Sequence, residues 1–427
     1  MRNTGLSSAE KYVTSLKSSA TDRDQTMLTN SRSTYGGVTK TFHWLTALLI
    51  LTLIPLGIYA NGLPYETGEQ LAFKAQVFSI HKTLGVTVFF VALTRILWAI
   101  SQPKPAPLHG DQKVQHFLAE TVHWLLYASL IVVPLSGWIH HAATTGFAPI
   151  WWPFGQSLPF VPKDDGLAHT FASLHIIFER VLLVAFLLHF AGAMKHHVID
   201  KDATLRRMLP GRTEPSAELA MPKSSMLPVV GALGAYAVAL VIGSSLGLFA
   251  SKDADAPAVP TLAAVETGWQ VTDGTLGISV TQLGSAVEGG FEDWTAAINF
   301  SEEADADGRH GDVEVTISIP SLTLGSVTSQ ALEPDFFDAN SFQTATFTAD
   351  IMADGEAYVA EGTLTLKGST QPVTLPFTLT IDGDTATMSG QTQLNRTNYN
   401  IGESYPDESS VAFPVDVTVN LTAVRQE

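Results

Sequence analysis

Two histidines lie in an apolar segment that is long enough to cross a membrane. The segment ASLHIIFERVLLVAFLLHFAGAMKHH, residues 172–197, carries His175 near one end and His189 near the other. Polar side chains at membrane depth are costly and are kept mainly for function. Fourteen residues of α-helix return to within about 40° of the same face and rise about 21 Å. We therefore expect both imidazoles on one helix face, one near each side of a membrane.

Two further histidines match this pair in depth. His43 lies near the start of the apolar stretch TFHWLTALLI, and His81 lies near the start of SIHKTLGVTVFF. If each stretch crosses the membrane in turn, His43 lies at the depth of His189, and His81 at the depth of His175. Neutral imidazoles that face each other across a helix bundle are the axial ligands of six-coordinate b-type haem. Zinc usually needs four ligands at one depth, which these pairs do not supply.

Two more polar residues are candidates for contact with a cofactor. His123, one or two turns inside the third apolar segment, is the nearest competitor for the ligand role of His43, or else a packing or haem-propionate partner. Arg95, at the end of the second segment, is a candidate propionate partner or an ordinary positively charged anchor. The remaining histidines lie at segment ends or in loops: His109, His116, His140, His141, His169, His196, His197 and His310.

Five apolar segments reach the length of about 20 residues that a membrane span needs. They are residues 42–60, 80–100, 117–139, 174–194 and 226–249. Loops rich in Lys and Arg stay in the cytoplasm. These residues gather before the first segment, after the second and after the fourth: Arg23, Arg32, Lys40, Lys104, Lys113, Lys195, Lys201, Arg206, Arg207 and Arg212. The pattern predicts a cytoplasmic N-terminus and a periplasmic chain after the fifth span.

The two halves of the chain differ in composition. Residues 251–427 carry 5 Lys and Arg against 27 Asp and Glu, a net charge of −22, whereas the first 250 residues are apolar with a net charge of +5. This predicts a membrane half joined to a soluble, acidic half, and neither offers a basic surface for nucleic acid. The chain has no cysteine. Disulfides, iron–sulfur clusters, thiolate ligation and covalently attached c-type haem are therefore excluded.

The chain divides into five predicted regions. The first 34 residues are rich in Ser and Thr and lack the apolar core of a signal peptide, so 1–34 is expected to be a disordered cytoplasmic leader, with Met27 as an alternative start. The regions that follow are a four-helix transmembrane domain at 35–212, a fifth span at 224–250, a charged linker rich in Pro and Ala at 251–267, and a periplasmic domain at 268–427.

Alternating residues characterise the C-terminal region. Apolar and polar side chains alternate in VDVTVNLTAV at 415–424, in VEVTISI at 313–319 and in TLTLKG at 363–368. Several such runs, separated by turns rich in Gly, Asp and Asn, predict an antiparallel β-barrel or β-sandwich.

The membrane half resembles the bacterial cytochrome b561 family over residues 35–210. The resemblance is carried by FHWLTALLI, IHKTLGVTVFFVALTRILW, ETVHWLLYASLIVVPLSGW and LHIIFERVLLVAFLLHFAGAMKHHVIDKDATLRRMLP. It implies an all-α four-helix bundle in the bacterial inner membrane with two haems b, whose ligands correspond to His43, His81, His175 and His189. It also implies one-electron exchange between haem and quinone and, in some members, oxidation of superoxide.

The C-terminal half resembles the YceI-like family of lipocalin-shaped barrels over residues 268–425. The matching stretches are GTLGISVTQLGSAVEGGFEDW, EPDFFDANSFQTATFTA, EGTLTLKGSTQPVTLPF and LNRTNYNIG. The resemblance implies an all-β antiparallel barrel around an apolar cavity for polyisoprenoid chains, including quinone-like lipids. Gln282 stands where a His is frequent in the family.

Four residues of the barrel are candidates for ligand binding. Arg396 corresponds to an Arg of the family, and a structural salt bridge explains it as well as ligand binding does. Phe342, Phe347 and Phe377 are expected to point inward. They line a pocket if the barrel is hollow and form a packed core if it is not.

The two halves together predict a membrane di-haem cytochrome b that transfers electrons between a periplasmic donor, a partner protein or superoxide, and the respiratory quinone pool. The barrel would bind an isoprenoid or quinone lipid. Two alternatives stay open: a haem-b anchor subunit of a larger dehydrogenase or hydrogenase, and a lipid-binding carrier with structural or sensory haems. The electron donor, the direction of electron flow, the ligand of the barrel and the oligomeric state are left open, and so is enzymatic activity as a superoxide:quinone oxidoreductase.

Overall fold

The computed structural model describes residues 28–108, 112–144, 147–211, 213, 225–250, 262–263, 265 and 267–426. Most of the expected leader, including Met27 and Arg23, lies outside the described residues, as do His109, Arg212 and nearly all of the expected linker. The chain divides into two compact units, one mainly helical and one built around a β-sheet, and residues 62–79 and 141–166 are grouped with the second unit. Each unit is described by itself.

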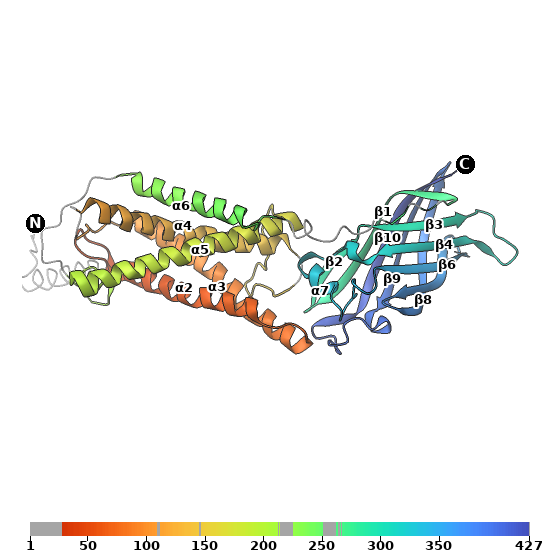
Figure 1. The fold of residues 1–427 in the computed structure, drawn as a ribbon, viewed down its shortest axis with the longest axis horizontal. Coiled ribbons are helices and arrows are strands. Elements are labelled where there is room, and N and C mark those ends of the chain that lie inside the picture. Colours follow the sequence, from red (N-terminus) through yellow and green to blue (C-terminus); the bar gives the residue numbers. More distant parts are fainter. Residues whose placement is uncertain are drawn as a thin grey trace, which may run out of the picture. The chain divides into compact units, whose positions relative to one another are not determined.

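Five long helices build the helical unit (Figure 1): α2 (Gly37–Gly62), α3 (Gly68–Ser101), α4 (Lys113–Ala143), α5 (Asp165–Lys195) and α6 (Leu227–Ser245). All five have the length and hydropathy of membrane spans, so the chain is a multi-pass membrane protein. The five predicted segments are confirmed. Helix α3 begins at Gly68 rather than at residue 80, because Leu71 and Ala75 continue a buried stripe at helical spacing.

The first four of these helices share one apolar core. Each contributes to a cluster of buried side chains: Ile50 from α2, Val88 and Ala92 from α3, Leu130 and Val133 from α4, and Leu182 from α5. The fifth helix, α6, packs on α4 and α5, where Leu125, Ala185 and Ala232 form a second buried cluster. A 2.6 Å hydrogen bond between the hydroxyls of Ser129 and Tyr236 also joins α6 to α4. The apolar stripes predicted from the sequence therefore build a four-helix bundle with one added helix.

The segment that follows α5 contacts the residues before α2 and the residues after α3. Arg207 is buried, and its guanidinium donates hydrogen bonds to the carbonyls of Ala106 at 3.0 Å and Ser33 at 2.7 Å. The Trp44 indole donates to the Met208 carbonyl at 2.8 Å. Arg207, one of the residues used to predict orientation, therefore also holds the loops of this unit together.

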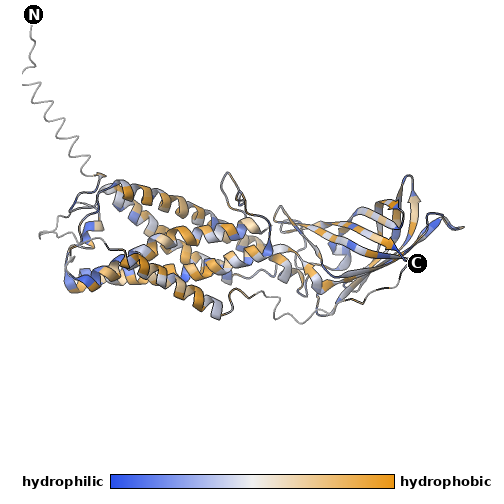
Figure 2. Cartoon of the chain, turned by 90° about the horizontal axis from the view of Figure 1, so that it is seen from above, coloured by the Kyte–Doolittle hydropathy of each residue, from blue (hydrophilic) through white to orange (hydrophobic). Residues whose placement is uncertain are grey.

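The second unit contains a ten-stranded antiparallel sheet with the order β3-β4-β6-β7-β8-β9-β10-β1-β2-β5. Its strands are β1 (Trp269–Gln282), β2 (Ser285–Phe291), β3 (Trp294–Phe300), β4 (Arg309–Ser318), β5 (Leu322–Thr323), β6 (Thr344–Asp354), β7 (Ala357–Leu366), β8 (Ser369–Asp382), β9 (Thr385–Asn395) and β10 (Val411–Arg425). Figure 2 shows apolar and polar residues alternating along these strands, whereas apolar residues dominate the helices.

The sheet curls into a lipocalin-like barrel. The start of β1 meets β3 through single hydrogen bonds instead of a strand ladder: Thr267 Oγ1 donates to the Ile298 carbonyl at 2.6 Å, and the Trp269 indole donates to the Phe300 carbonyl at 3.2 Å. The three alternating runs noted in the sequence lie in β4, β7 and β10. The predicted all-β antiparallel fold is confirmed, with inward side chains supplied by every second residue of each long strand.

Candidate functional site

Three histidines from three helices meet at one level of the bundle. The ring centroids of His43 on α2 and His189 on α5 lie 6.1 Å apart. His123 on α4 also lies close to His189, with 5.3 Å between the ring centroids. Arg95 on α3 interacts electrostatically with all three rings, and its guanidinium carbon lies 5.4 Å from the ring centroid of Tyr127. We call His43, His123 and His189 the His189 group.

The second level of the bundle holds His175 on α5 and His81 on α3, which interact electrostatically and are called the His175 group. Nδ1 of His175 lies 2.8 Å from the backbone oxygen of Val133 on α4. A carbonyl oxygen can only accept, so Nδ1 carries the proton and the lone pair of Nε2 stays available. Metal-ligating histidines are commonly oriented in this way.

A glycine opposite His175 allows this approach. A Cβ atom at Gly137 would lie 2.9 Å from Nδ1 of His175 and 3.0 Å from its Cε1, which is closer than such atoms normally approach. The Ser136 hydroxyl donates to the same Val133 oxygen at 2.9 Å, which a carbonyl with two lone pairs permits. The stretch from Val133 to Gly137 therefore forms a backbone cradle for the His175 ring.

Helix α2 repeats this cradle against His81. A Cβ atom at Gly57 would lie 2.8 Å from Cε1 and 3.2 Å from Nδ1 of the His81 ring. The backbone of Leu53 lies near the His81 ring, and buried Nδ1 has no hydrogen-bond partner among the described residues. Gly57 follows Leu53 by four residues, as Gly137 follows Val133. In each helix, therefore, one turn that ends in glycine lies against a histidine ring.

Nothing in the pattern of histidines predicts the two cradle glycines, Gly57 and Gly137. A usable signal was present, because the first and third apolar segments contain PLG at 55–57 and PLSG at 134–137. Glycine inside an apolar helix costs stability relative to alanine, and it commonly marks a close approach.

The residues at the two levels fit haem b. Each level offers neutral imidazole nitrogens from facing helices, which is the donor set of bis-histidine haem. The backbone hydrogen bond of His175 uses Nδ1, so the lone pair of Nε2 can bind iron. The two cradle glycines leave room for the rings of His175 and His81. Buried His81 Nδ1, without a regular partner, belongs to the same level.

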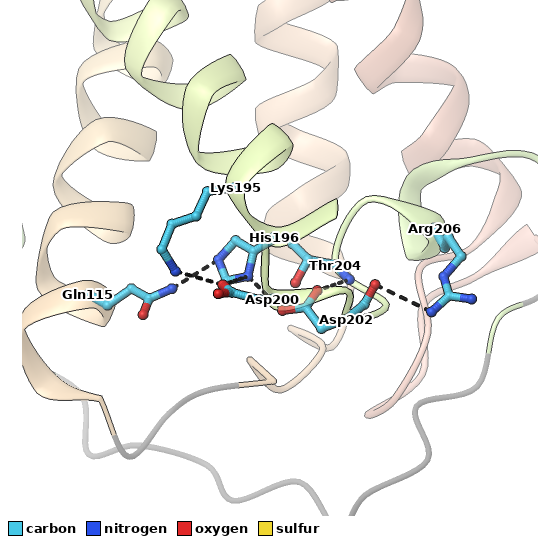
Figure 3. A network of polar contacts seen from close by, with 7 residues as sticks. All are labelled: Gln115, Lys195, His196, Asp200, Asp202, Thr204 and Arg206. Carbon is cyan, nitrogen blue, oxygen red and sulfur yellow. Dashed lines mark hydrogen bonds and ion pairs between the residues drawn. The ribbon is translucent and has the colours of Figure 1, made fainter. Parts of the chain in front are cut away.

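A third polar group lies just beyond α5 (Figure 3). His196, Asp200 and Asp202 are the one set of three potential metal-ligating side chains within the described residues whose ligand atoms all lie within 4.8 Å of one another. Lys195 Nζ bonds Asp200 at 2.6 Å, and Nδ1 of His196 bonds Asp202 at 2.6 Å. The Thr204 backbone N–H donates to Asp202 at 2.7 Å. Protein donors therefore satisfy these carboxylates, and the group stabilises the end of α5.

The barrel encloses an apolar cavity of about 270 Å³. Phe347 on β6 and Phe377 on β8 line it, so the barrel is hollow where these rings face inward. Phe342 is not among the lining residues, contrary to expectation: its ring lies against Gly368, in the turn between β7 and β8. The reason is that Phe342 precedes β6, so the inward alternation of the strand does not extend to it.

Arg396 is buried at the edge of this cavity, where all its donors are used. Its guanidinium donates to five backbone carbonyls at 2.6–3.0 Å, those of Ala412, Ile401, Gly402, Tyr405 and Val411. A guanidinium has five N–H donors, so none remains for a ligand. Burial lowers the pKa of Arg396, and the nearby carboxylate of Asp335 opposes this shift. The expected salt bridge is thus replaced by a clamp on backbone carbonyls.

A bundle of membrane-length helices that brings histidines together at two levels defines a membrane haem protein of the b type. Residues 34–211 match the family model described as prokaryotic cytochrome b561, and residues 269–423 match the model of the YceI-like domain. The chain belongs to the cytochrome b561 family, a family of membrane electron-transfer haem proteins, and carries a YceI-like domain at its C-terminal end.

Three named proteins are similar to parts of this chain. "Cytochrome b561 homolog 2" of Escherichia coli (strain K12) is 33% identical over 183 residues, which is 42% of this chain and 94% of the relative. "Probable superoxide oxidase CybB" of Yersinia pestis is 27% identical over 169 residues, 39% of this chain and 91% of the relative. The crystal structure of Burkholderia cenocepacia BcnA aligns with 31% identity over 35% of this chain and 96% of that protein, with a TM-score of 0.33.

Proposed function

We propose that this protein is a di-haem membrane cytochrome b that transfers electrons between a periplasmic donor and the quinone pool. The observation that carries the proposal is the presence of histidines from facing helices at two levels of one bundle, the His189 group and the His175 group. Each level would hold one haem b, which supplies a one-electron iron couple when bound.

We assign His43 and His189 as the ligands at one level and His81 and His175 at the other. The rings of His43 and His189 come from facing helices and their centroids lie 6.1 Å apart, so these two side chains would hold one haem b between them. His123 and Arg95 are assigned to propionate contacts. The positive charge of Arg95 would compensate a carboxylate that the apolar bundle desolvates.

For the donor, we propose superoxide, with the named relative from Yersinia pestis as support. Two superoxide anions would each lose one electron and leave as O₂, and one quinone would take up the two electrons and two protons to become the quinol. The activity is thus that of a superoxide:quinone oxidoreductase.

We further propose that the N-terminus is cytoplasmic and the barrel periplasmic, in a bacterial inner membrane. An odd number of spans places the two ends on opposite sides, and the Lys- and Arg-rich loop after α5 supports this orientation. The domain limits are those of the sequence analysis: leader 1–34, bundle 35–212, fifth span 224–250, linker 251–267 and barrel 268–427.

The barrel is proposed to bind an isoprenoid or quinone lipid in its apolar cavity. Each buried CH₂ group is worth about 0.8 kcal/mol, so part of an isoprenoid tail suffices for firm binding. Phe347 and Phe377 line the cavity and are the proposed ligand contacts. Arg396, with its donors used, and Phe342, outside the cavity, are assigned to structure.

A pyridine haemochrome assay on the purified protein tests the haem proposal. The expected result is two haems b per polypeptide, with low-spin spectra. One haem or none per chain would contradict it. Mass spectrometry of the lipid that co-purifies with the protein tests the barrel, where an isoprenoid is expected. Re-oxidation of superoxide-reduced protein by added quinone tests the activity.

A further inference from the structure

One polar side chain in the barrel cavity has an atom that is buried and unbonded. Gln282 lines the cavity, and the residue is 5% exposed. Its Oε1 has no hydrogen-bond partner in the described part of the chain. A buried acceptor without a partner is costly, and such groups in native proteins call for an explanation.

The strand pattern directs this side chain inward. Gln282 is the last residue of β1, in register with the cavity-lining residues Leu276, Ile278 and Val280. Every second residue of a strand points to the same face. Val411 on β10 and Ser285 on β2 flank it in the sheet. The side chain of residue 282 therefore points into the cavity, where it is an amide among aliphatic side chains.

Three other polar side chains line the cavity, and each donates at least one hydrogen bond within the barrel. Gln330, in the short helix α7 (Thr328–Ala331), donates to the Tyr405 hydroxyl at 3.0 Å. The Thr392 hydroxyl donates to the Thr374 carbonyl at 2.9 Å. Arg396 uses all five donors on backbone carbonyls. Gln282 differs from them because its Oε1 is buried and has no hydrogen-bond partner among the described residues.

The other end of β1 is apolar. Trp269, the first residue of the strand, forms a buried cluster with Ala386 and Ala423, and its indole N–H is used by the Phe300 carbonyl. Trp269 and Gln282 are the first and last of the 14 residues of this extended strand. The cavity therefore has an unused hydrogen-bonding group at one end of this strand and apolar side chains at the other.

We infer that the cavity holds an isoprenoid in one direction, with a hydrogen-bonding head group at Gln282 and the hydrocarbon tail toward Trp269. This inference rests on the proposed isoprenoid binding and specifies that the isoprenoid carries a hydrogen-bonding head group. An isoprenoid that ends in a hydroxyl, or in a ring that bears one, satisfies the free oxygen. An amide can also turn and present its N–H₂, so a carbonyl on a head group is accepted too. An isoprenoid hydrocarbon without any polar group is disfavoured.

The test uses the full-length protein, purified in one detergent. Equal amounts of an isoprenoid alcohol and an isoprenoid hydrocarbon with the same number of isoprene units are added, and native mass spectrometry measures the ratio of the two bound species. The same mixture is given to Gln282→Met, which keeps the shape of the side chain and removes both polar atoms. Because detergent and mixture are identical, partition into micelles cancels when the two ratios are compared.

We expect the alcohol-to-hydrocarbon ratio to fall about threefold to tenfold in Gln282→Met, the factor that one buried hydrogen bond typically contributes. Gln282→His, which can still form a hydrogen bond, should keep most of the preference. Gln391→Met on the outer face of β9 is the matched control, because Gln391 is exposed, and its ratio should equal that of the unaltered protein.

The outcomes separate this inference from the proposal on which it rests. Equal ratios in the unaltered protein and in Gln282→Met, with isoprenoid bound to both, would overturn the role of Gln282 and leave isoprenoid binding in place. Absence of both lipids from the unaltered protein would overturn both. If Gln282→Met does not fold, loss of the preference in Gln282→His would contradict the inference.

Discussion

Nδ1 of His175 donates a hydrogen bond to the backbone oxygen of Val133, 2.8 Å away on the neighbouring helix. Since the acceptor is a carbonyl, the bond sets both the tautomer and the direction of the ring. The bond exists because residue 137, one turn further along α4, has no side chain that would keep the ring away. Helix α2 places Gly57 against the His81 ring in a similar way, although Nδ1 of His81 has no hydrogen-bond partner among the described residues. The positions of both rings, and the tautomer of His175, thus depend on groups that cannot themselves bind iron.

The first prediction concerns these glycines. Gly137→Val places a side chain where Cβ alone would lie 2.9 Å from Nδ1 of His175, so the ring must move and its haem is lost. The low-spin spectrum should keep one component and lose the other, and haem content should fall from two to about one per chain. Gly57→Val should remove the same component, because it displaces the partner ligand His81.

The control for the glycines is Gly234→Ala in α6, where a Cβ atom meets nothing within 4 Å. This change should retain both haems and raise helix stability by up to about 1 kcal/mol. If Gly137→Val and Gly57→Val kept both spectral components, the cradles would have no part in haem binding.

The second prediction concerns the partner of His189. His43→Ala and His189→Ala should each remove one and the same spectral component, and His123→Ala should retain it with a shifted midpoint potential. His81→Ala and His175→Ala should remove the other component. Redox titration followed by optical spectra provides the measurement. If His123→Ala removed the component and His43→Ala did not, the ligand would be His123, whose ring centroid is 5.3 Å from that of His189.

The third prediction distinguishes a structural Arg396 from a ligand-binding one. Arg396→Lys keeps the charge but has at most three donors for the five carbonyls, so the barrel should lose about 2–4 kcal/mol of unfolding free energy. Circular dichroism during thermal unfolding measures the loss. The haem spectrum should not change.

The comparison for Arg396 is Arg309→Lys. Arg309 pairs with Asp305 and Asp350 on the exposed surface, where ion pairs contribute little to stability. Its substitution should barely shift the unfolding transition. If Arg396→Lys shifted the unfolding transition as little as Arg309→Lys does but lowered isoprenoid binding, Arg396 would be a ligand-binding residue and not a structural one.

The fourth prediction is topological. An alkaline phosphatase fused after residue 427 should be active, because this enzyme folds only outside the cytoplasm, and α6 is expected to carry the chain across. A fusion after residue 213, before α6, should be inactive. Equal activity of both fusions, in proteins that insert stably, would mean that α6 does not cross the membrane.

The coarse architecture can be predicted from the sequence because the signals for it are local. Five apolar segments and several alternating runs follow from the periods of helix and strand, and both parts of the fold were predicted correctly. Helix limits were less accurate. Helix α3 extends back to Gly68, where a buried stripe rather than overall hydropathy carries the helix.

The candidate site was predicted only in part. The pairing of histidines by depth needs only the rise of a helix and the number of crossings, so the sequence suffices for it. That His123 also reaches His189 depends on how α4 is turned about its axis. Arg396 and Phe342 were candidates for ligand contact. The sequence does not reveal that the donors of Arg396 are already used by backbone carbonyls. It also does not reveal where the ring of Phe342 lies, because this residue is outside a regular strand.

The amino-acid sequence by itself determined which segments are helices and strands, how many times the chain can cross a membrane and which residues could ligate haem, because these follow from local period, length and chemistry. Only the tertiary structure decided which ring meets which backbone carbonyl, which glycines make room for histidines, and which polar atom of the barrel is left without a partner. Those properties depend on contacts between residues far apart in the chain, such as Val133 with His175 or Arg396 with Val411, and local patterns carry no record of them.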